Sequence, residues 1–224
     1  MSAVTTPAVL AQEEARALPF GWPPPPSRQL VRAAARPPVP WKNGGGSTRE
    51  LAIWPPGACV DDFVWRASVA RIDAPGPFSV FAGIERLLTV IDGPTLELLE
   101  SDNRRHRLAR WDTLAFAGET PISVPDSAGV THDFNLMWRR GAGHGSVRLW
   151  RDRHEVQVAI GSVVLYCAAG RYGVGGEVLE AGDAMVLCQA QRTAVWIVPQ
   201  SADAVLLDAQ VACQAPDTVQ GERK

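Results

Sequence analysis

The 224-residue chain has few of the side chains that build metal centres. It contains four histidines and four cysteines, without a His-x-His or a Cys-x-x-Cys pair. A protein metal site needs several nitrogen, sulfur or oxygen ligands that converge on one point, and closely spaced pairs of this kind usually supply them. The sequence therefore predicts no metal site and no cofactor.

Paired cysteines and long hydrophobic runs are missing too. Cys167 and Cys188 lie inside apolar runs, and Cys59 and Cys213 are distant in sequence from both, as is typical of free thiols in a reducing compartment. No segment approaches the roughly 18 apolar residues of a membrane-spanning helix. The N-terminus also lacks a basic region followed by an apolar core. We expect a cytoplasmic protein that does not bind a membrane.

An excess of positive charge is also absent. The formal net charge is -2, so the chain has no general attraction for nucleic-acid phosphates. One basic cluster, Arg104 to Arg107 with Arg110, is flanked by Asp102 and Asp112 and falls where a hairpin loop is expected. We predict that this cluster is solvated and that nucleic acid is not a partner. Phosphate-binding loops, dinucleotide-binding motifs and nucleophile elbows do not occur.

Short apolar segments separated by Gly, Pro or Asp fill most of the chain. They are rich in Val, Leu, Ile, Trp and Phe, which is typical of an all-β sandwich or barrel. One short helix is predicted, at 8–18. Strands are predicted at 28–34, 48–54, 62–72, 79–81, 86–91, 95–99, 106–109, 113–116, 121–124, 131–139, 146–150, 155–159, 162–168, 176–179, 184–188, 194–198 and 203–211.

A weak internal repeat divides the chain. The segment 87–116 parallels 163–187, and each copy has an aspartate, Asp112 or Asp183, at a turn before an alternating strand. The Asp183 carboxylate is expected to accept backbone N–H bonds at its turn. The predicted organisation is a Pro-rich N-terminal extension, two β halves and a C-terminal tail, with bounds 1–27, 28–126, 127–213 and 214–224.

Four segments carry a resemblance to a known family. They are Trp41–Glu50, which contains a triple glycine, Trp65–Ala70, Gly76–Arg86 and Asp133–Gly141. Their order and joint presence resemble the HutD/Ves family of small bacterial proteins. The resemblance implies an all-β double cupin with two jelly-roll-like β-barrel halves. It also implies an association with histidine utilisation and a regulatory or ligand-sensing role, without a firmly established reaction.

Strand alternation groups polar side chains on single faces. Arg66 and Ser68 alternate with Trp65 and Val69, so they point together. They face either solvent or a cavity, for which the small Ala70 beside them is suited. In a cavity, an arginine can clamp a carboxylate through two parallel N–H bonds.

The other segments present similar choices. Thr48 and Glu50 follow the triple glycine and are either surface residues or the lining of a polar barrel mouth. Asp133, Asn135 and Arg139 share one strand face, where they form either a structural network or a ligand site. Adding the residues near these strands, we predict that the ligand-binding side chains are Lys42, Asn43, Thr48, Glu50, Arg66, Ser68, Phe78, Ser79, Phe81, Arg86, Asp133, Asn135 and Arg139.

If these side chains converge, positive donors outnumber Glu50, and the expected partner is a small anionic metabolite that carries carboxylates. The family resemblance points to an intermediate of histidine catabolism, such as formylglutamate or urocanate. We expect a non-enzymatic binding protein with an indirect regulatory role in histidine or amino-acid catabolism. The alternative is a metal-independent isomerase or hydrolase of a small organic acid, with Glu50 or Asp133 as general base and Lys42 or Arg66 stabilising negative charge. A homodimer is compatible with either function.

Overall fold

The computed structural model describes residues 25–126 and 128–213. Within them the chain forms 19 strands and one short 3-10 helix, Ala33–Ala35. The all-β prediction is therefore confirmed, whereas the helix predicted at 8–18 lies outside the described residues. In the described part of the chain, no helix is long and apolar enough to cross a membrane.

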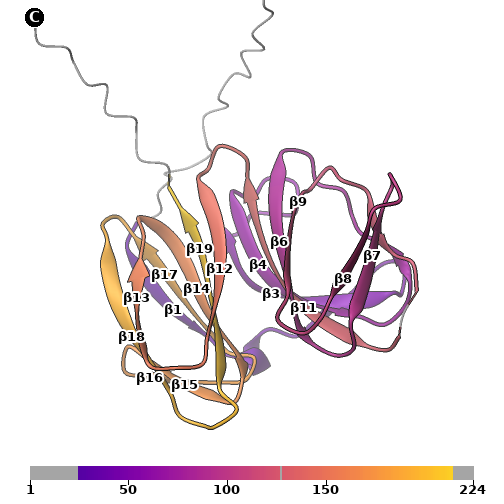
Figure 1. The fold of residues 1–224 in the computed structure, drawn as a ribbon. Helices are drawn as coiled ribbons and strands as arrows, with labels where there is room; N and C mark the ends of the chain where they lie inside the picture. Colours follow the sequence, from indigo (N-terminus) through magenta and orange to yellow (C-terminus); the bar gives the residue numbers. More distant parts are fainter. Residues whose placement is uncertain (1–24, 127, 214–224) are drawn as a thin grey trace, which may run out of the picture.

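The first half of the fold consists of two antiparallel sheets that pack around a common interior (Figure 1). Apolar side chains from both sheets, such as Ile72, Leu88 and Leu98, pack between them. The inner sheet has the order β2 (Val39–Pro40), β3 (Gly46–Trp54), β4 (Trp65–Ile72), β11 (Thr131–Arg139), β6 (Ile84–Asp92) and β9 (Thr113–Ala117). The outer sheet has the order β5 (Gly76–Pro77), β10 (Ile122–Val124), β7 (Leu96–Glu100) and β8 (Arg105–Leu108).

The second half repeats this plan with an inner and an outer sheet. Its interior is filled by apolar side chains from both, including Val163, Leu179 and Ile197. The inner sheet has the order β1 (Ser27–Val31), β17 (Ala184–Gln189), β14 (Gly161–Ala169), β19 (Val205–Ala212) and β12 (His144–Trp150). The outer sheet has the order β13 (His154–Val158), β18 (Thr193–Pro199), β15 (Arg171–Val174) and β16 (Glu177–Glu180).

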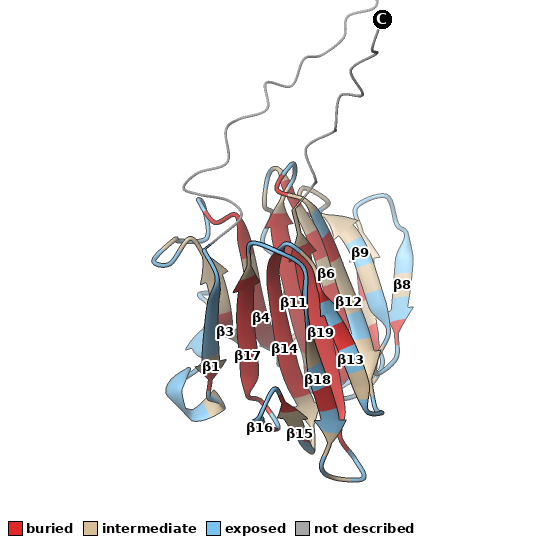
Figure 2. Cartoon of the chain, turned by 90° about the vertical axis from the view of Figure 1, so that its left-hand side faces the viewer, coloured by how far each residue is buried: buried red, intermediate tan, exposed pale blue. Residues whose placement is uncertain are grey.

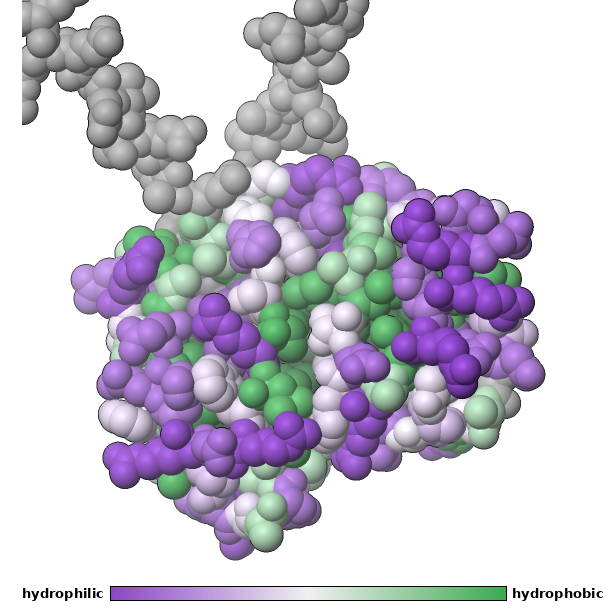
Figure 3. Space-filling view, in the orientation of Figure 1, coloured by the Kyte–Doolittle hydropathy of each residue, from purple (hydrophilic) through white to green (hydrophobic). Residues whose placement is uncertain are grey.

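The two inner sheets pack against each other. Val69 and Phe134 from the first half share one apolar cluster with Val164, Tyr166 and Leu207 from the second. Figure 2 shows the resulting burial gradient, with β14, β17 and β19 largely buried and β8 and much of β13 and β18 exposed. Figure 3 shows hydrophobic residues gathered where the halves meet and hydrophilic ones towards the outer parts. The central strands of the inner sheets, such as β11 and β14, are thus covered on both faces.

The repeated aspartate turns have the same construction in both halves. The Asp112 N–H donates to the Ala109 carbonyl at 3.0 Å, and the Asp183 N–H donates to the Glu180 carbonyl at 2.9 Å. Each carboxylate accepts the N–H of that same earlier residue, at 2.8 and 3.1 Å. The predicted turn role of Asp183 is confirmed, and the weak sequence repeat corresponds to a repeated structural unit.

Sheet membership does not follow the predicted boundary between residues 126 and 127. Strand β11 follows that boundary in sequence but lies in the first inner sheet, between β4 and β6. Strand β1 pairs with β17 in the second inner sheet, where Figure 1 shows its indigo ribbon beside orange strands. The exchange has a physical reason, because β1 satisfies backbone groups at the otherwise open edge of β17.

The strand predicted at 79–81 is wrong. Residues 79–81 form no strand, and β5 lies just before them, at Gly76–Pro77. The segment is held instead by backbone bonds, in which the N–H groups of Phe78 and Phe81 donate to the carbonyls of Ile122 and Gly118 at 2.8 Å each. Strands β2 and β15 were not predicted from the sequence.

Candidate functional site

A cavity of about 670 Å³ opens in the first half, on the face of the inner sheet that points away from the second half. Its wall is completed by the loop around Lys42 and by residues 77–81. The lining residues are Pro40, Trp41, Lys42, Asn43, Thr48, Val60, Arg66, Ser68, Ala70, Pro77, Phe78, Ser79, Phe81, Arg86, Asp133, Asn135 and Met137.

Strand register places the polar lining in rows across the sheet. Met137 on β11 lies between Arg66 on β4 and Arg86 on β6. One step along, Asn135 lies beside Ser68. Because alternate residues of a strand share a face, these side chains all point to the cavity, while their sequence neighbours point into the core between the halves. The solvent-facing interpretation of Arg66 and Ser68 is therefore wrong.

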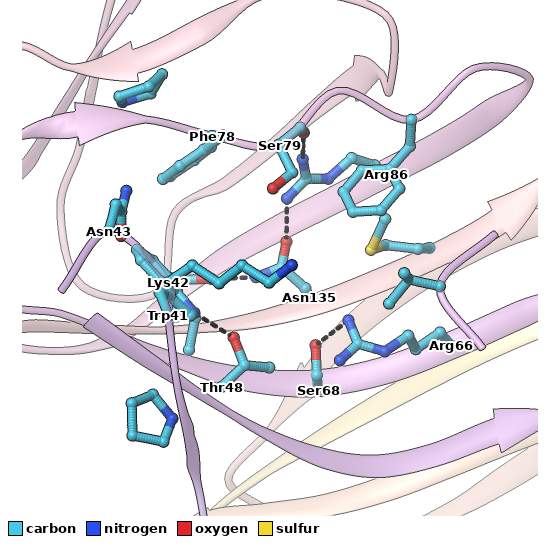
Figure 4. A pocket seen from close by; sticks show the side chains of 17 residues that line it. Trp41, Lys42, Asn43, Thr48, Arg66, Ser68, Phe78, Ser79, Arg86 and Asn135 are labelled. Carbon is cyan, nitrogen blue, oxygen red and sulfur yellow. Dashed lines mark hydrogen bonds between the residues drawn. The ribbon is translucent and has the colours of Figure 1, made fainter. Parts of the chain in front are cut away.

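Arg86 and Asp133 are linked through Asn135. Arg86 Nη2 donates to Asn135 Oδ1 at 3.0 Å (Figure 4), and Asn135 Nδ2 donates to Asp133 Oδ1. Asp133 is 1% exposed and Arg86 is 7% exposed. Asp133 Oδ2 and Arg86 Nε are buried and have no hydrogen-bond partner within the described residues. The network therefore leaves one acceptor and one donor unsatisfied.

Burial shifts the protonation of both charged groups. Loss of water raises the pKa of Asp133 to about 7, against the opposing effects of the Arg86 charge and the Asn135 hydrogen bond. Burial likewise lowers the pKa of Arg86 to about 10, although the Asp133 charge acts in the opposite direction. Arg86 therefore remains a cation at neutral pH, whereas the carboxyl group of Asp133 gains or loses its proton near that pH.

Aromatic rings surround the Arg86 guanidinium. Its central carbon lies 5.7 Å from the ring centre of Phe78, 5.6 Å from that of Phe81 and 4.7 Å from that of Phe116. Its Nη1 also donates to the Ser79 carbonyl at 3.5 Å. The negative ring faces stabilise a guanidinium that has lost much of its water, so Arg86 is held in place.

The loop that follows β2 forms another part of the cavity wall. Trp41 Nε1 donates to Thr48 Oγ1 at 2.7 Å, and the Gly45 N–H donates to Asn43 Oδ1 at 3.0 Å. Gly46 passes so close to the Arg71 carbonyl that a Cβ would overlap it. These contacts fix the loop against the sheet, with the Lys42 side chain placed in the cavity lining (Figure 4).

All predicted site residues line this cavity except Glu50 and Arg139. Glu50 accepts a hydrogen bond from Arg66 Nε at 2.9 Å but lines a separate cavity of about 390 Å³. Arg139, at the end of β11, donates to the carbonyls of Phe63 and Asp61 at 3.2 and 3.3 Å. Glu50 thus holds a cavity arginine in place, and Arg139 fastens a loop.

Comparison with known proteins agrees with this fold. The HutD family model matches residues 33–206. The chain belongs to the HutD family. Protein Ves of Citrobacter koseri is 32% identical over 184 residues, which cover 80% of this chain and 93% of that protein. An uncharacterised 21.2 kDa protein from the hutC 3′ region of Pseudomonas putida is 34% identical over 146 residues, 65% of this chain and 76% of its own.

Solved structures confirm the double-cupin prediction. HutD from Pseudomonas fluorescens SBW25 superposes with a TM-score of 0.74 at 26% identity, covering 84% of this chain and all (100%) of that one. YhhW from Escherichia coli superposes at 0.59 with 14% identity, covering 85% and 100%. Hazelnut vicilin superposes at 0.53 with 9% identity, covering 82% and 85%. The last two are similar in fold alone.

Several lining residues of this HutD-family cavity were not predicted from the sequence. Met137 and Ala70 were detectable, because they share strand faces with Asn135 and Arg66. Trp41 lies in the glycine-rich segment, but a tryptophan at this position is typical of an aromatic side chain packed in the core. No sequence signal marks Val60, whose loop is brought to the cavity by tertiary packing.

The interior of the second half differs in composition from that of the first. It is filled with hydrocarbon, although β19 also carries an acid–amide pair, in which Gln210 Nε2 donates to Asp208 Oδ1 at 2.9 Å. No group of three or more His, Cys, Asp or Glu residues suited to hold a metal occurs in the described structure. The polar groups that line the 670 Å³ cavity are those of the first half.

Proposed function

We propose that this protein binds a small carboxylate metabolite in the first-half cavity and acts in histidine catabolism through the occupied or empty state of that cavity. The observation that carries the proposal is the placement of three cations, Lys42, Arg66 and Arg86, in one lining. Asp133 is the sole acidic side chain in that lining. A carboxylate entering the cavity therefore meets a net positive field, with the Arg66 guanidinium suited to bind it and Arg86 adding positive charge.

The family comparisons support the association with histidine catabolism. The chain belongs to the HutD family, and one relative is described from the hutC 3′ region. Formylglutamate and urocanate, which are both carboxylates, fit a cavity of about 670 Å³ and are our first candidates.

Binding is best tested by calorimetric titration with N-formyl-L-glutamate, urocanate, glutamate and formate. We expect at least one of these acids to bind, and Arg66→Ala to weaken that binding by about ten-fold or more, since a hydrogen-bonded charge pair contributes on the order of 1.5–3 kcal/mol. Arg71→Ala is the matched control, because Arg71 lies on the same strand, is exposed and pairs with Asp73. Absence of binding for every acid contradicts the proposal.

One observation favours acid–base catalysis as a second candidate. Asp133 lines the cavity and has a pKa of about 7, which suits a general base at neutral pH. Glu50, the other carboxylate considered from the sequence, lies outside this cavity. Turnover of a bound acid, followed by NMR and abolished in Asp133→Asn with binding retained, would establish an isomerase or hydrolase. Binding without turnover supports the non-enzymatic function.

A further inference from the structure

Asp133 presents an unsatisfied acceptor within the cavity lining. Its Oδ1 is occupied by Asn135, but its buried Oδ2 has no partner in the described structure. The residues beside it in register, Ala70 and Val90, have no side-chain donor to offer. A buried acceptor without a donor costs roughly 1–3 kcal/mol, and more when charged. A bound molecule that supplies the donor removes this cost.

Neighbouring charges on the inner sheet do not fill that role. Arg86 Nη2 donates to Asn135 rather than to Asp133, its Nη1 donates to the Ser79 carbonyl, and its Nε has no partner within the described residues. Arg66 is held by Glu50 at 2.9 Å. The cations therefore stabilise Asp133 through space and leave Oδ2 without a hydrogen bond.

Other elements around the barrel supply no donor either. Lys42 lines the cavity from its loop, and no bond from it to Asp133 is present. On the outer sheet, Glu100 and His106 pair with each other at 2.6 Å, and neither lines the cavity. His132 precedes Asp133 but lies near Asp92, with its Nδ1 4.0 Å from that carboxylate.

We infer that Asp133 makes the cavity selective for acids that carry an N–H donor in addition to a carboxylate. The inference rests on the proposed carboxylate binding and specifies its substrate class. An acylated amino acid, for example, gives its carboxylate to Arg66 or Lys42 and its amide N–H to Asp133 Oδ2. A simple dicarboxylate of the same length brings only acceptors towards a carboxylate, which repels them.

The raised pKa of Asp133 predicts how acids without a donor behave. Such an acid binds well only when Asp133 takes up a proton, because the protonated form neither repels the ligand nor leaves a buried charge unpaired. Its affinity therefore falls as pH rises above about 7, the pKa of this group. An acid with an N–H donor binds the ionised form of Asp133, so its affinity does not fall as pH rises above that value.

The test compares N-formyl-L-glutamate with its ester analogue, in which an oxygen atom replaces the N–H. Both compounds are titrated into the full chain at about pH 6 and about pH 8. At the higher pH the N–H compound should bind about ten-fold or more tightly than the ester, and at the lower pH the difference in affinity between them should be smaller. Equal affinity and equal pH dependence of the two compounds overturn the donor preference and leave carboxylate binding intact. Absence of binding by both overturns the proposed function as well.

A variant provides a second test. In Asp133→Asn, the amide oxygen stays with Asn135 Nδ2, so the new NH2 group faces the ligand. We expect the preference to reverse towards the ester analogue and its pH dependence to disappear. Asp92→Asn, which changes an exposed aspartate on β6, is the matched control. If Asp133→Asn loses its circular dichroism signal, the comparison of the two compounds on the unaltered protein still decides.

Discussion

Glu50 and Arg66 form an ion pair beside the cavity, with Glu50 Oε2 and Arg66 Nε 2.9 Å apart. Arg66 lines the cavity, whereas Glu50 is not among its lining residues. Glu50 therefore acts on a ligand through the position of Arg66. This arrangement separates a positioning role for Glu50 from the general-base role considered from the sequence.

Replacing Glu50 with Gln tests that separation. Glutamine keeps an oxygen that can accept the Arg66 Nε–H bond, so we expect carboxylate affinity to change by less than about three-fold and stability by no more than about 1 kcal/mol, as for other partly exposed pairs. Calorimetry and urea unfolding provide the measurements. Loss of a catalytic activity in Glu50→Gln, with binding unchanged, contradicts the positioning role.

Asp133 is predicted to make stability depend on pH. Its folded pKa of about 7 lies above the ordinary value of 3.8, so the unfolded chain releases this proton at lower pH than the folded chain. Folding stability is therefore lost as pH rises between these values, by up to about 4 kcal/mol for this one group. Asp133→Asn removes the loss.

Urea unfolding at about pH 4 and about pH 8 measures the effect. Relative to the unaltered protein, Asp133→Asn should be more stable at the higher pH than at the lower one. The comparison across pH cancels the cost of leaving Arg86 without a counter-charge, since Asp133 is already neutral at the low pH. The same stability difference at both values shows that burial does not raise the Asp133 pKa.

Gly46, the first residue of β3 after the loop that carries Lys42, is predicted to tolerate no side chain. A Cβ there overlaps the Arg71 carbonyl and approaches Trp41 to 3.0 Å. Gly46→Ala should lower the free energy of unfolding by about 1–3 kcal/mol, as overpacking does elsewhere, and weaken ligand binding by displacing the loop. Gly44→Asn is the control, because Gly44 has a φ of 72° and open space around it. Equal stability of the two variants contradicts this packing role.

The two repeated aspartates should differ in their contribution to stability. Besides its local bond, Asp183 accepts the Ala33 N–H at 2.9 Å and an Arg32 hydrogen bond at 2.7 Å, whereas Asp112 is exposed and makes the local bond. Asp183→Ala should therefore cost about 2–4 kcal/mol and Asp112→Ala about 1 kcal/mol. Thermal and urea unfolding give both values, and a reversed order refutes the assignment.

Much of the candidate site was predictable because it lies on regular strands. Period-two alternation placed Arg66 with Ser68 and Asp133 with Asn135, and both pairs line the cavity. The sequence left open whether these faces meet solvent. In the structure the four sheets are stacked, so the inner strands of the first half pack against the second half on one face and line the cavity on the other.

The remaining differences arise where the chain departs from local regularity. Glu50 keeps the register that pairs it with Ser68, and the β-bulge follows it, between Glu50 and Ala52; its carboxylate is taken up by Arg66 instead of lining the cavity. Arg139 lies at a strand end, where backbone carbonyls of a distant loop capture its guanidinium. The exchange of β1 and β11 between the halves depends on contacts that are distant in sequence, so no local pattern reveals it.

A crystal structure of the protein soaked with the tightest-binding acid from the titrations provides the decisive measurement. We predict a carboxylate within hydrogen-bond distance of Arg66 or Lys42, in the cavity that Asp133 and Asn135 also line. Ligand density in the smaller cavity beside Glu50, with the first-half cavity empty, would contradict the proposed binding site.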